Sequence, residues 1–578
     1  MRSVLPSVVV LCAGAGVGLA QHDPSVLLLT GADATGLPGV FFDDFSRVSF
    51  DAAGGVVFRA GLDGLGVSAA NEESFWRLHE GALTLIARAG NPAPFNAPGF
   101  TFTGMDNIVA QGDSAVFSAT ASNDGGATER SGIWRWTQGV GIELLVGVGD
   151  VLPGLGGAPV EGVNRSAFAA NASGDVAFVG ALDAGFATTG LWQIVDGVTS
   201  VVAIEYEPTP DGGPNPFSSN LIRARIDDNA AVAIGGLLVS SDAAAYSTRD
   251  GSLQKVARSG DALNNRPAET LGLIETINQR SDGLLAFSGS LDIFGFDSAI
   301  FAESAPGVLD VVIAEGDPAS GVPGALIDGF GAFFTPFAVS DSGHIAYHAS
   351  FTGMDVINGF NDEGIWYGPV GAQTLVARLA SPDPVLGEQI AGFVPLWFGF
   401  EQDLLPVIAR NGDAFFYAQL LTSDETNDAI FHVAPGQDPT LMLRAGDTFD
   451  VLGDGSDIRT FDSPNDAPDY FSLPVFPTGE NDASGLASSV NDDADVILAL
   501  PFTDGSEGLV LFERLEADPN CNPADLSEPF GVLDFSDVIT FVIAFGDMDP
   551  AADLGAPAGV FDFVDVLAFL GAFGSGCP

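Results

Sequence analysis

The sequence predicts an all-β protein, an eight-bladed β-propeller closed by its N-terminal strand, followed by a small α-helical module. Three observations predict this organisation. A strand pattern recurs eight times between residues 21 and 515, one strand is missing after the last copy and present before the first, and residues 521–578 carry a duplicated motif with helical periodicity. We therefore divide the chain into a signal peptide (1–20), a β-propeller (21–515) and a C-terminal module (516–578).

The first twenty residues have the pattern of a secretory signal peptide. Arg2 is followed by an apolar run from Val4 to Leu19, and small residues precede Gln21. A lipoprotein attachment at Cys12 is the less favoured alternative, because Leu11 stands where a small residue is expected. No later stretch has the length of an apolar membrane span. We expect a secreted protein, extracellular or at the cell surface, with no membrane span.

The chain is strongly acidic. It has 76 Asp and Glu against 20 Lys and Arg, a formal net charge of -56. Nucleic acid and anionic lipid would be repelled by such a surface, so we expect no nucleic-acid partner. Because 46% of residues are hydrophobic, the acidity belongs to a folded chain and not to a disordered tail.

Each repeat contains three recognisable elements. The first is a turn followed by alternating apolar residues, the second is usually small-apolar-aromatic, and the third is an apolar strand that runs into a Gly-Asp turn. The first element lies at 54–58, 113–117, 174–178, 229–234, 282–287, 343–347, 412–416 and 494–498. The second lies at 74–76, 132–134, 190–192, 299–301, 364–366 and 429–431, weaker at 245–246 and 508–510; the third lies at 85–90, 145–150, 256–261, 312–317, 375–378 and 443–447.

The repeats are offset in a way that favours a closed ring. After the eighth copy of the second element the third is absent, but residues 26–33 at the N-terminus have its pattern. An N-terminal strand that completes the last blade covers an otherwise exposed sheet edge. A linear solenoid would need polar caps at both ends instead.

The repeat, an Asn/Asp-x-x-Gly-x-Val-Ala-Phe strand, a Gly-Ile-Trp strand and a Val-Ala-x-x-Gly-Asp turn, resembles a tandem-repeat family of exported bacterial proteins. Members of that family end in varied anchoring modules and have no established activity. The resemblance covers nearly all of residues 26–515. It implies the β-propeller-like architecture and adds nothing on function.

The C-terminal module is a duplication with a period of 28 residues. Asp525, Gly531, Asp534 and Asp537 recur as Asp553, Gly559, Asp562 and Asp565. Each loop leads into an apolar helix with phenylalanines four residues apart on one face. Cys521 and Cys577, the two cysteines outside the signal peptide, bracket the module, so we expect a disulfide between them worth about 4 kcal/mol.

This pattern is similar to the dockerin repeat, a half EF-hand, and the ending Gly576-Cys577 opposite Cys521 resembles the GC-type dockerin. The resemblance implies a cohesin-like partner and Ca2+ as the cofactor. The matching ligand positions are Asp525, Ser527, Glu528, Asp534 and Asp537 in the first loop, and Asp553, Asp562 and Asp565 in the second.

The two loops depart from the usual pattern. The first is one residue longer than the twelve-residue EF-hand loop, and Pro529 and Pro557 stand near positions where a carboxylate is expected. Since calcium takes six to eight oxygens, the second loop is short of ligands. The alternative is that Asp537 and Asp565 are first-turn carboxylates favoured by the helix dipole, without a metal.

Catalytic motifs are scarce. His344 and His348 lie four residues apart in a strand pattern and need not converge on a metal, and the other three histidines are scattered. The sequence has no nucleophile elbow, phosphate-binding Gly-Lys loop or zinc-protease motif. One repeat position carries four arginines, Arg88, Arg258, Arg378 and Arg444. They form either a ring that faces an anionic ligand in the channel or, as we favour, arginine–carboxylate pairs that pin neighbouring blades.

Two functional hypotheses follow, and the fold does not decide between them. We favour a non-catalytic binding or scaffold protein, in which the propeller presents a ligand-binding surface and the C-terminal module docks to a cohesin-like or cell-surface protein. The alternative is a secreted carbohydrate-active enzyme, a glycoside hydrolase or lyase acting on a polysaccharide. Two close carboxylates beside exposed aromatic residues would favour the enzyme.

Overall fold

The structure is a computed structural model. It describes residues 22–575 except 51–53, 126–127, 183–187, 213–216, 218–223, 238–241, 292–296, 331–336, 384, 386, 394–405, 423–424, 453–454, 463–487, 515–523, 525, 528–532, 534, 548–551, 553, 555–560 and 562. Contacts divide the chain into two compact units, which contain Pro24–Glu513 and Arg514–Pro578.

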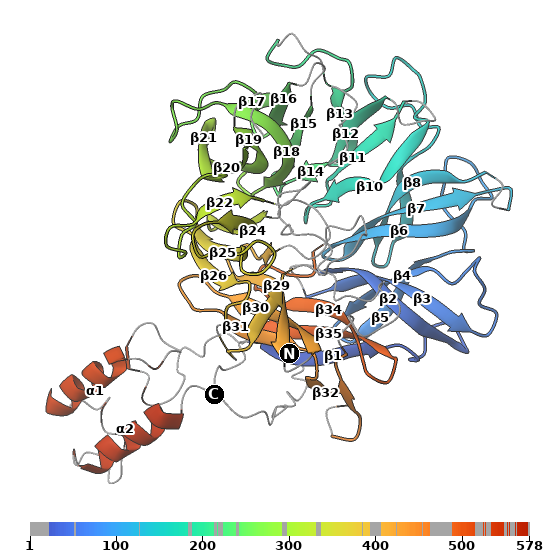
Figure 1. Ribbon diagram of the computed structural model, residues 1–578. Coiled ribbons are helices and arrows are strands. Elements are labelled where there is room, and N and C mark those ends of the chain that lie inside the picture. The colour runs from blue at the N-terminus through green and yellow to red at the C-terminus, as the bar shows by residue number, and fades with distance from the viewer. Residues whose placement is uncertain are drawn as a thin grey trace. The chain divides into compact units, whose positions relative to one another are not determined.

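The first unit contains eight sheets arranged around a common centre (Figure 1), which are the blades, and one further two-stranded sheet. Blade 1 contains β2 (Val40–Phe50), β3 (Val56–Gly64), β4 (Ser74–His79) and β5 (Ala82–Arg88). Blade 2 contains β6 (Thr101–Gln111), β7 (Ser114–Ser122), β8 (Arg130–Thr137) and β9 (Gly141–Gly147), and blade 3 contains β10 (Gly162–Ala170), β11 (Val176–Ala181), β12 (Thr189–Val195) and β13 (Val198–Ile204). Blade 4 contains β14 (Arg225–Ile226), β15 (Val232–Leu237), β16 (Ala243–Ser247) and β17 (Gln254–Arg258), and blade 5 contains β18 (Leu271–Gln279), β19 (Leu285–Leu291), β20 (Ser298–Ala305) and β21 (Val308–Ala314).

Blades 6 and 7 each have a first strand that is split into two short pieces. Blade 6 contains β22 (Leu326–Gly329), β23 (Phe337–Val339), β24 (His344–Thr352), β25 (Glu363–Pro369) and β26 (Thr374–Arg378). Blade 7 contains β27 (Gln389–Gly392), β28 (Val407–Ile408), β29 (Ala414–Thr422), β30 (Glu425–Val433) and β31 (Thr440–Arg444). A separate hairpin of β32 (Thr448–Asp450) and β33 (Ile458–Thr460) follows.

The last blade joins the two ends of the ring. It contains β34 (Val496–Pro501) and β35 (Glu507–Arg514), and β1 (His22–Leu29) pairs with β35 in the order β1-β35-β34. Just beyond β1, the amide of Thr30 donates to the carbonyl of Glu507 (2.9 Å) and the amide of Glu507 donates to Thr30 Oγ1 (2.9 Å). The N-terminal strand thus takes the place of the strand that the eighth repeat lacks, as the sequence predicts.

The aromatic position of the second element fills the interior of the blades. Trp76, Trp134, Trp192 and Trp366 are fully buried. The indole nitrogens of the last three donate to carbonyls of the connection that enters the same blade, those of Pro94 (2.7 Å), Pro153 (2.9 Å) and Ser320 (2.9 Å). Tryptophan suits this position because it combines a large apolar surface with one donor that must find a partner when buried.

The Gly-Asp turn that ends blades 2, 4, 5 and 7 follows from local backbone chemistry. The glycine takes a left-handed conformation, as Gly260 does with φ 87°, and the aspartate then accepts the amide three residues earlier, as Asp261 does from Arg258 (2.8 Å). Blade 6 has Ala380 at the glycine position, with φ 58°. A residue with a Cβ is strained in this conformation.

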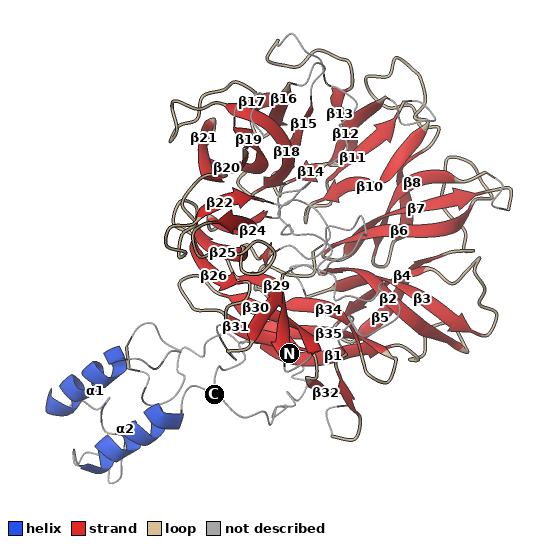
Figure 2. Cartoon of the chain, in the orientation of Figure 1, coloured by secondary structure: helices blue, strands red, loops and turns tan. Residues whose placement is uncertain are grey.

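The second unit contains the two predicted helices, α1 (Phe535–Asp547) and α2 (Phe563–Ser575), shown in blue in Figure 2. Phe541 and Phe569 stack with ring centroids 4.1 Å apart and are buried. Phe545 and Phe573 extend the contact one helical turn further. Among the helices that the structure describes, none is long and apolar enough to cross a membrane.

Candidate functional site

The turns between the first and second strands of the blades meet at the centre of the ring. Arg410, in this turn of blade 7, lies 2.6 Å from Asp228 of blade 4 and 3.0 Å from Asp492 of blade 8, with Asp341 of blade 6 at 3.9 Å. Because blades 4 and 7 are not neighbours, a contact between them must cross the axis of the ring. One guanidinium group therefore holds carboxylates from three other blades.

Other turns of this central set are hydrogen-bonded from one blade to the next. The side-chain amide of Gln111 donates to the carbonyl of Asn171 (2.8 Å), and that of Asn171 donates to the carbonyl of Asp227 (2.9 Å). Further along, Asn229 donates to the carbonyl of Ser281 (3.0 Å), whose amide donates to Asp341 Oδ1 (2.8 Å). The Asn and Asp residues of the repeat thus serve to join the blades, in addition to forming turns.

Asp227 is the most perturbed acid of this set. Its side chain is buried, and burial raises its pKa to about 6, against the amides of Ala231 and Asn229, which donate to Oδ1 at 2.7 and 2.9 Å. The nearby charges of Asp228 and Asp282 act in the same direction as burial. The centre of the ring is thus crowded with negative charge, which Arg410 partly neutralises.

A cavity of about 620 Å³ lies between blades 2 and 3. Three acids line it: Asp106 on β6, Glu129 just before β8, and Glu161 just before β10. The hydroxyl-bearing residues Thr120, Ser131, Ser166 and Thr189 also line it. No aromatic residue is found among the described residues of the lining.

One arginine enters the same cavity. Nη1 of Arg165, on β10, contacts both carboxylate oxygens of Asp106 at 2.7 and 2.8 Å. Burial raises the pKa of Asp106; Arg165 acts in the opposite direction, and the charge of Glu73 adds to the rise. Glu73 in turn accepts the amide of Met105 (2.7 Å) and pairs with Arg59 (2.5 Å). The two neighbouring acids Glu73 and Asp106 thus have Arg59 of blade 1 and Arg165 of blade 3 as their cationic partners.

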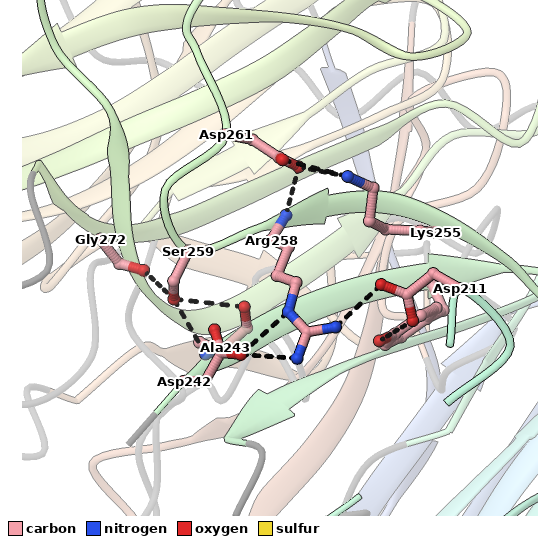
Figure 3. Close-up of polar contacts among 9 residues, drawn as sticks. Asp211, Asp242, Ala243, Lys255, Arg258, Ser259, Asp261 and Gly272 are labelled. Atoms are coloured by element: carbon pink, nitrogen blue, oxygen red, sulfur yellow. Dashed lines mark hydrogen bonds and ion pairs between the residues drawn. The ribbon is translucent and has the colours of Figure 1, made fainter. Parts of the chain in front are cut away.

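The four arginines at one repeat position lie on the last strand of their blades. Arg258 donates to Asp242 (2.9 and 2.6 Å) and Asp211 (2.8 Å), as Figure 3 shows. Arg444 pairs with Glu388 (2.8 Å). Arg88 and Arg378 donate to backbone carbonyls, those of Asn71 (2.7 Å) and Asn361 (3.1 Å).

These partners belong to the same blade as the arginine or to the connection that enters it. The interpretation as a ring facing a channel ligand is therefore wrong. The favoured interpretation is right about a carboxylate partner for Arg258 and Arg444, but the contacts fix the outer edge of one blade and do not pin neighbouring blades. A shared repeat position indicates that the four arginines have the same role. It does not indicate how far from the axis of the propeller their side chains lie.

Of the predicted calcium ligands, Ser527, Asp537 and Asp565 are described; Asp525, Glu528, Asp534, Asp553 and Asp562, and both cysteines of the predicted disulfide, Cys521 and Cys577, lie outside the described residues. Asp537 is buried, and its Oδ1 accepts the amides of Leu526 (2.8 Å) and Ser527 (2.9 Å) and the hydroxyl of Ser527 (3.0 Å). Two predicted ligand side chains thus converge. The same hydrogen bonds also fit the metal-free alternative, and within the described residues no group of three His, Cys, Asp or Glu side chains is arranged to hold a metal.

The cavity and the Arg410 cluster were not anticipated from the sequence. Both combine residues from blades that are far apart in the chain, and a repeat pattern does not align them in space. The signal that could have found the cavity is a charged residue within the first strand of a blade, such as Asp106 or Arg165.

The ring of eight sheets around a common axis defines a β-propeller, with a small helical unit after it. The chain belongs to the family of unknown function DUF7453, which it matches over residues 15–135 and 50–516. No curated protein matches the sequence.

Several solved structures resemble the propeller. They include Saccharomyces cerevisiae Sqt1 (10% identity, TM-score 0.34, covering 73% of this chain and 95% of that one) and the β-propeller domain of the trilobed protease from Pyrococcus furiosus (9%, 0.31, 70% and 98%). The polysaccharide lyase Uly1 is a third (10%, 0.32, 74% and 92%). At these identities and TM-scores, none of them transfers a function to this chain.

Proposed function

We propose that the protein is a secreted or cell-surface binding protein. Its propeller presents a ligand-binding surface, and its C-terminal module attaches it to a cohesin-like domain or another cell-surface protein. The support for attachment is the apolar surface of the two helices, and the support for binding is the cavity between blades 2 and 3.

The helices expose apolar side chains although the core between them is complete. Phe541 and Phe569 are buried, yet seven large apolar residues stay between 46% and 68% exposed. They are Ile539, Val542 and Ile543 on α1 and Phe563, Val564, Leu567 and Leu570 on α2. Exposed apolar surface of this kind, within a small unit, marks a protein-interaction site. This is the single observation that carries the docking proposal.

Calcium would support docking by ordering the start of α1. In the proposal the first loop holds the ion through Ser527 and Asp537, together with the other predicted ligands of that loop. The ion supplies positive charge that fixes carboxylates and hydroxyls in one arrangement, and it has no role in chemistry. The second loop, with fewer oxygen ligands, is proposed to bind calcium more weakly.

The docking proposal is tested by calorimetric titration of the full chain with a panel of cohesin-type domains, with calcium and with chelator. We expect saturable binding to at least one domain, and a loss of about tenfold or more in affinity for Val542→Lys and Leu567→Lys. The matched control is Val140→Lys, which changes an 84% exposed apolar residue of blade 2. Binding that the two helix variants leave unchanged would contradict the proposal.

The carbohydrate-active alternative is favoured by one feature only, the carboxylates in the cavity. Asp106, Glu129 and Glu161 could supply an acid and a base. The aromatic surface on which a sugar ring would stack is missing from the described lining. The binding protein and the enzyme are distinguished by incubating the full chain with a polysaccharide panel and measuring reducing ends and unsaturated products. A rate of polysaccharide cleavage that Asp106→Asn abolishes would favour the enzyme over the binding protein.

A further inference from the structure

We propose that the cavity between blades 2 and 3 binds a ligand that carries primary ammonium groups, such as a polyamine or an oligomer of an amino sugar. This rests on the proposed function of the propeller as a ligand-binding body and specifies its ligand class. The argument comes from the size, the charge and the hydrogen-bonding capacity of the lining.

The cavity has the volume of a small-ligand site. Its volume of about 620 Å³ falls within the range that is usual for sites that bind small molecules. Strands and connections of two blades build it, so its walls are fixed by the sheets. Asp106 and Thr120 come from blade 2, and Arg165 and Thr189 come from blade 3.

The charge of the described lining is negative. Three carboxylates, those of Asp106, Glu129 and Glu161, face one guanidinium group, that of Arg165. Since Arg165 is engaged by both oxygens of Asp106, these two charges neutralise each other. Glu129 and Glu161, both exposed, remain as the charges that a ligand meets. Arg130, the residue after Glu129, lies over the ring of Phe100 at 5.6 Å and is not part of the lining.

A further acid lies behind the wall. Glu205 is buried and accepts both the amide (2.7 Å) and the hydroxyl (2.8 Å) of the lining residue Thr189. A hydroxyl has one proton, so the oxygen of Thr189 can only accept further hydrogen bonds. Thr189 thus presents an acceptor beside the carboxylates of Glu129 and Glu161, and an ammonium group, with three donors and a positive charge, is the complementary partner.

A neutral sugar fits this lining less well. It would leave Glu129 and Glu161 without a counter-charge, and the described lining offers no aromatic ring for stacking. An anionic ligand would meet only Arg165, which Asp106 already neutralises. These two comparisons separate the ammonium ligand from the other polar classes.

The test is a calorimetric titration of the full chain, under chelator, with spermidine and with an oligomer of glucosamine. The matched probe is the N-acetylated form of the same oligomer, which keeps the skeleton and loses the charge. We expect binding of spermidine, of the glucosamine oligomer, or of both, without binding of the acetylated form. Which amine binds identifies the source of the ammonium group.

Two variants locate the site. Glu129→Gln and Glu161→Gln, at exposed positions, should each weaken binding about tenfold by removing one counter-charge. The control is Glu143→Gln, also on blade 2, whose side chain is 63% exposed and pairs with Arg135 outside the cavity. Circular dichroism confirms that the variants are folded.

Three results would overturn the proposal: no binding of either amine, equal binding of the acetylated oligomer, or an equal loss in Glu143→Gln, which would indicate attraction to the acidic surface as a whole. In a second titration, calcium replaces the chelator. If calcium displaces the amine, the cavity is a site for a divalent cation and not for an ammonium group. None of these outcomes bears on the titration with cohesin-type domains, which uses the helix surface, so the two proposals fail separately.

Discussion

Nη1 of Arg410 lies 2.6 Å from Oδ2 of Asp228, although 182 residues and two intervening blades separate them. The contact links opposite parts of the ring directly. The side chain of Arg410 is 18% exposed, so solvent only partly screens its ion pair with Asp228.

Loss of this arginine should destabilise the propeller. Arg410→Met leaves Asp228, Asp341 and Asp492 close together without a cation, and we expect the free energy of unfolding to fall by about 2–4 kcal/mol. Urea titration measures this free energy of unfolding for the parent chain and the variant. The control is Lys255→Met, which breaks an exposed pair with Asp261 and should cost less than about 1 kcal/mol. Equal losses in both variants would show that the central position of Arg410 has no special effect.

Removal of the N-terminal strand should open the ring. A chain that begins at Gly31 lacks β1, and the unpaired edge of β35 is then free to pair with other molecules. We expect aggregation in size-exclusion chromatography and a lower unfolding midpoint. Truncation after Arg514 removes only the second unit and should leave the midpoint of the propeller unchanged. A chain lacking β1 that stays monomeric and equally stable would refute closure by this strand.

Acidification from pH 7 to pH 5 should stabilise the propeller. The folded state raises the pKa of Asp227 from 3.8 to about 6, so the folded chain binds a proton that the unfolded chain does not bind in this range. The destabilising effect of the charged form is complete above pH 6 and disappears as pH falls toward 3.8. Burial raises the pKa of Asp106, Glu275 and Glu507 as well, which adds in the same direction.

Thermal unfolding at constant ionic strength checks this dependence. Asp227→Asn should be less dependent on pH between 5 and 7 than the parent chain, because one of the groups that titrates there is gone. A parent chain that loses stability on acidification over this range would contradict the prediction.

Glycine at position 380 should stabilise blade 6. Ala380 has φ 58°, where blades 1, 2, 4, 5 and 7 have a glycine with positive φ, and Ala380→Gly removes the strain. We expect a gain of about 0.5–1 kcal/mol, the strain relieved less the entropy added to the unfolded chain. The control is Ala445→Gly, just before the turn of blade 7, which should cost a similar amount because no positive φ is relieved there. Urea titration of both variants decides the sign.

The sequence predicted the number of blades and their closure because both are visible along the chain. The eight turns before β3, β7 and their equivalents recur at regular spacing, and the predicted element at 26–33 overlaps β1, the missing member of the last sheet. The two helices followed from the spacing of Phe541 with Phe545 and of Phe569 with Phe573. These features depend on local periodicity and on counting.

The candidate sites were not predictable in the same way. Asp106 and Arg165 meet because two inner strands lie side by side, and Arg410 meets Asp228 because the ring has a particular diameter. Neither condition is encoded in the spacing of one repeat. The four repeated arginines show the converse: their periodicity was visible, but their location on the outermost strands was not.

The place of β35 in its sheet has a mechanical consequence. A tether at the C-terminal module would pull the ring at Arg514, the end of a strand that has β1 on one side and β34 on the other. Tension along the chain is then shared by two hydrogen-bonded ladders, whereas a strand at a sheet edge would have only one. We expect single-molecule pulling at this terminus to require more force once the N-terminal strand is in place than in a chain that lacks it.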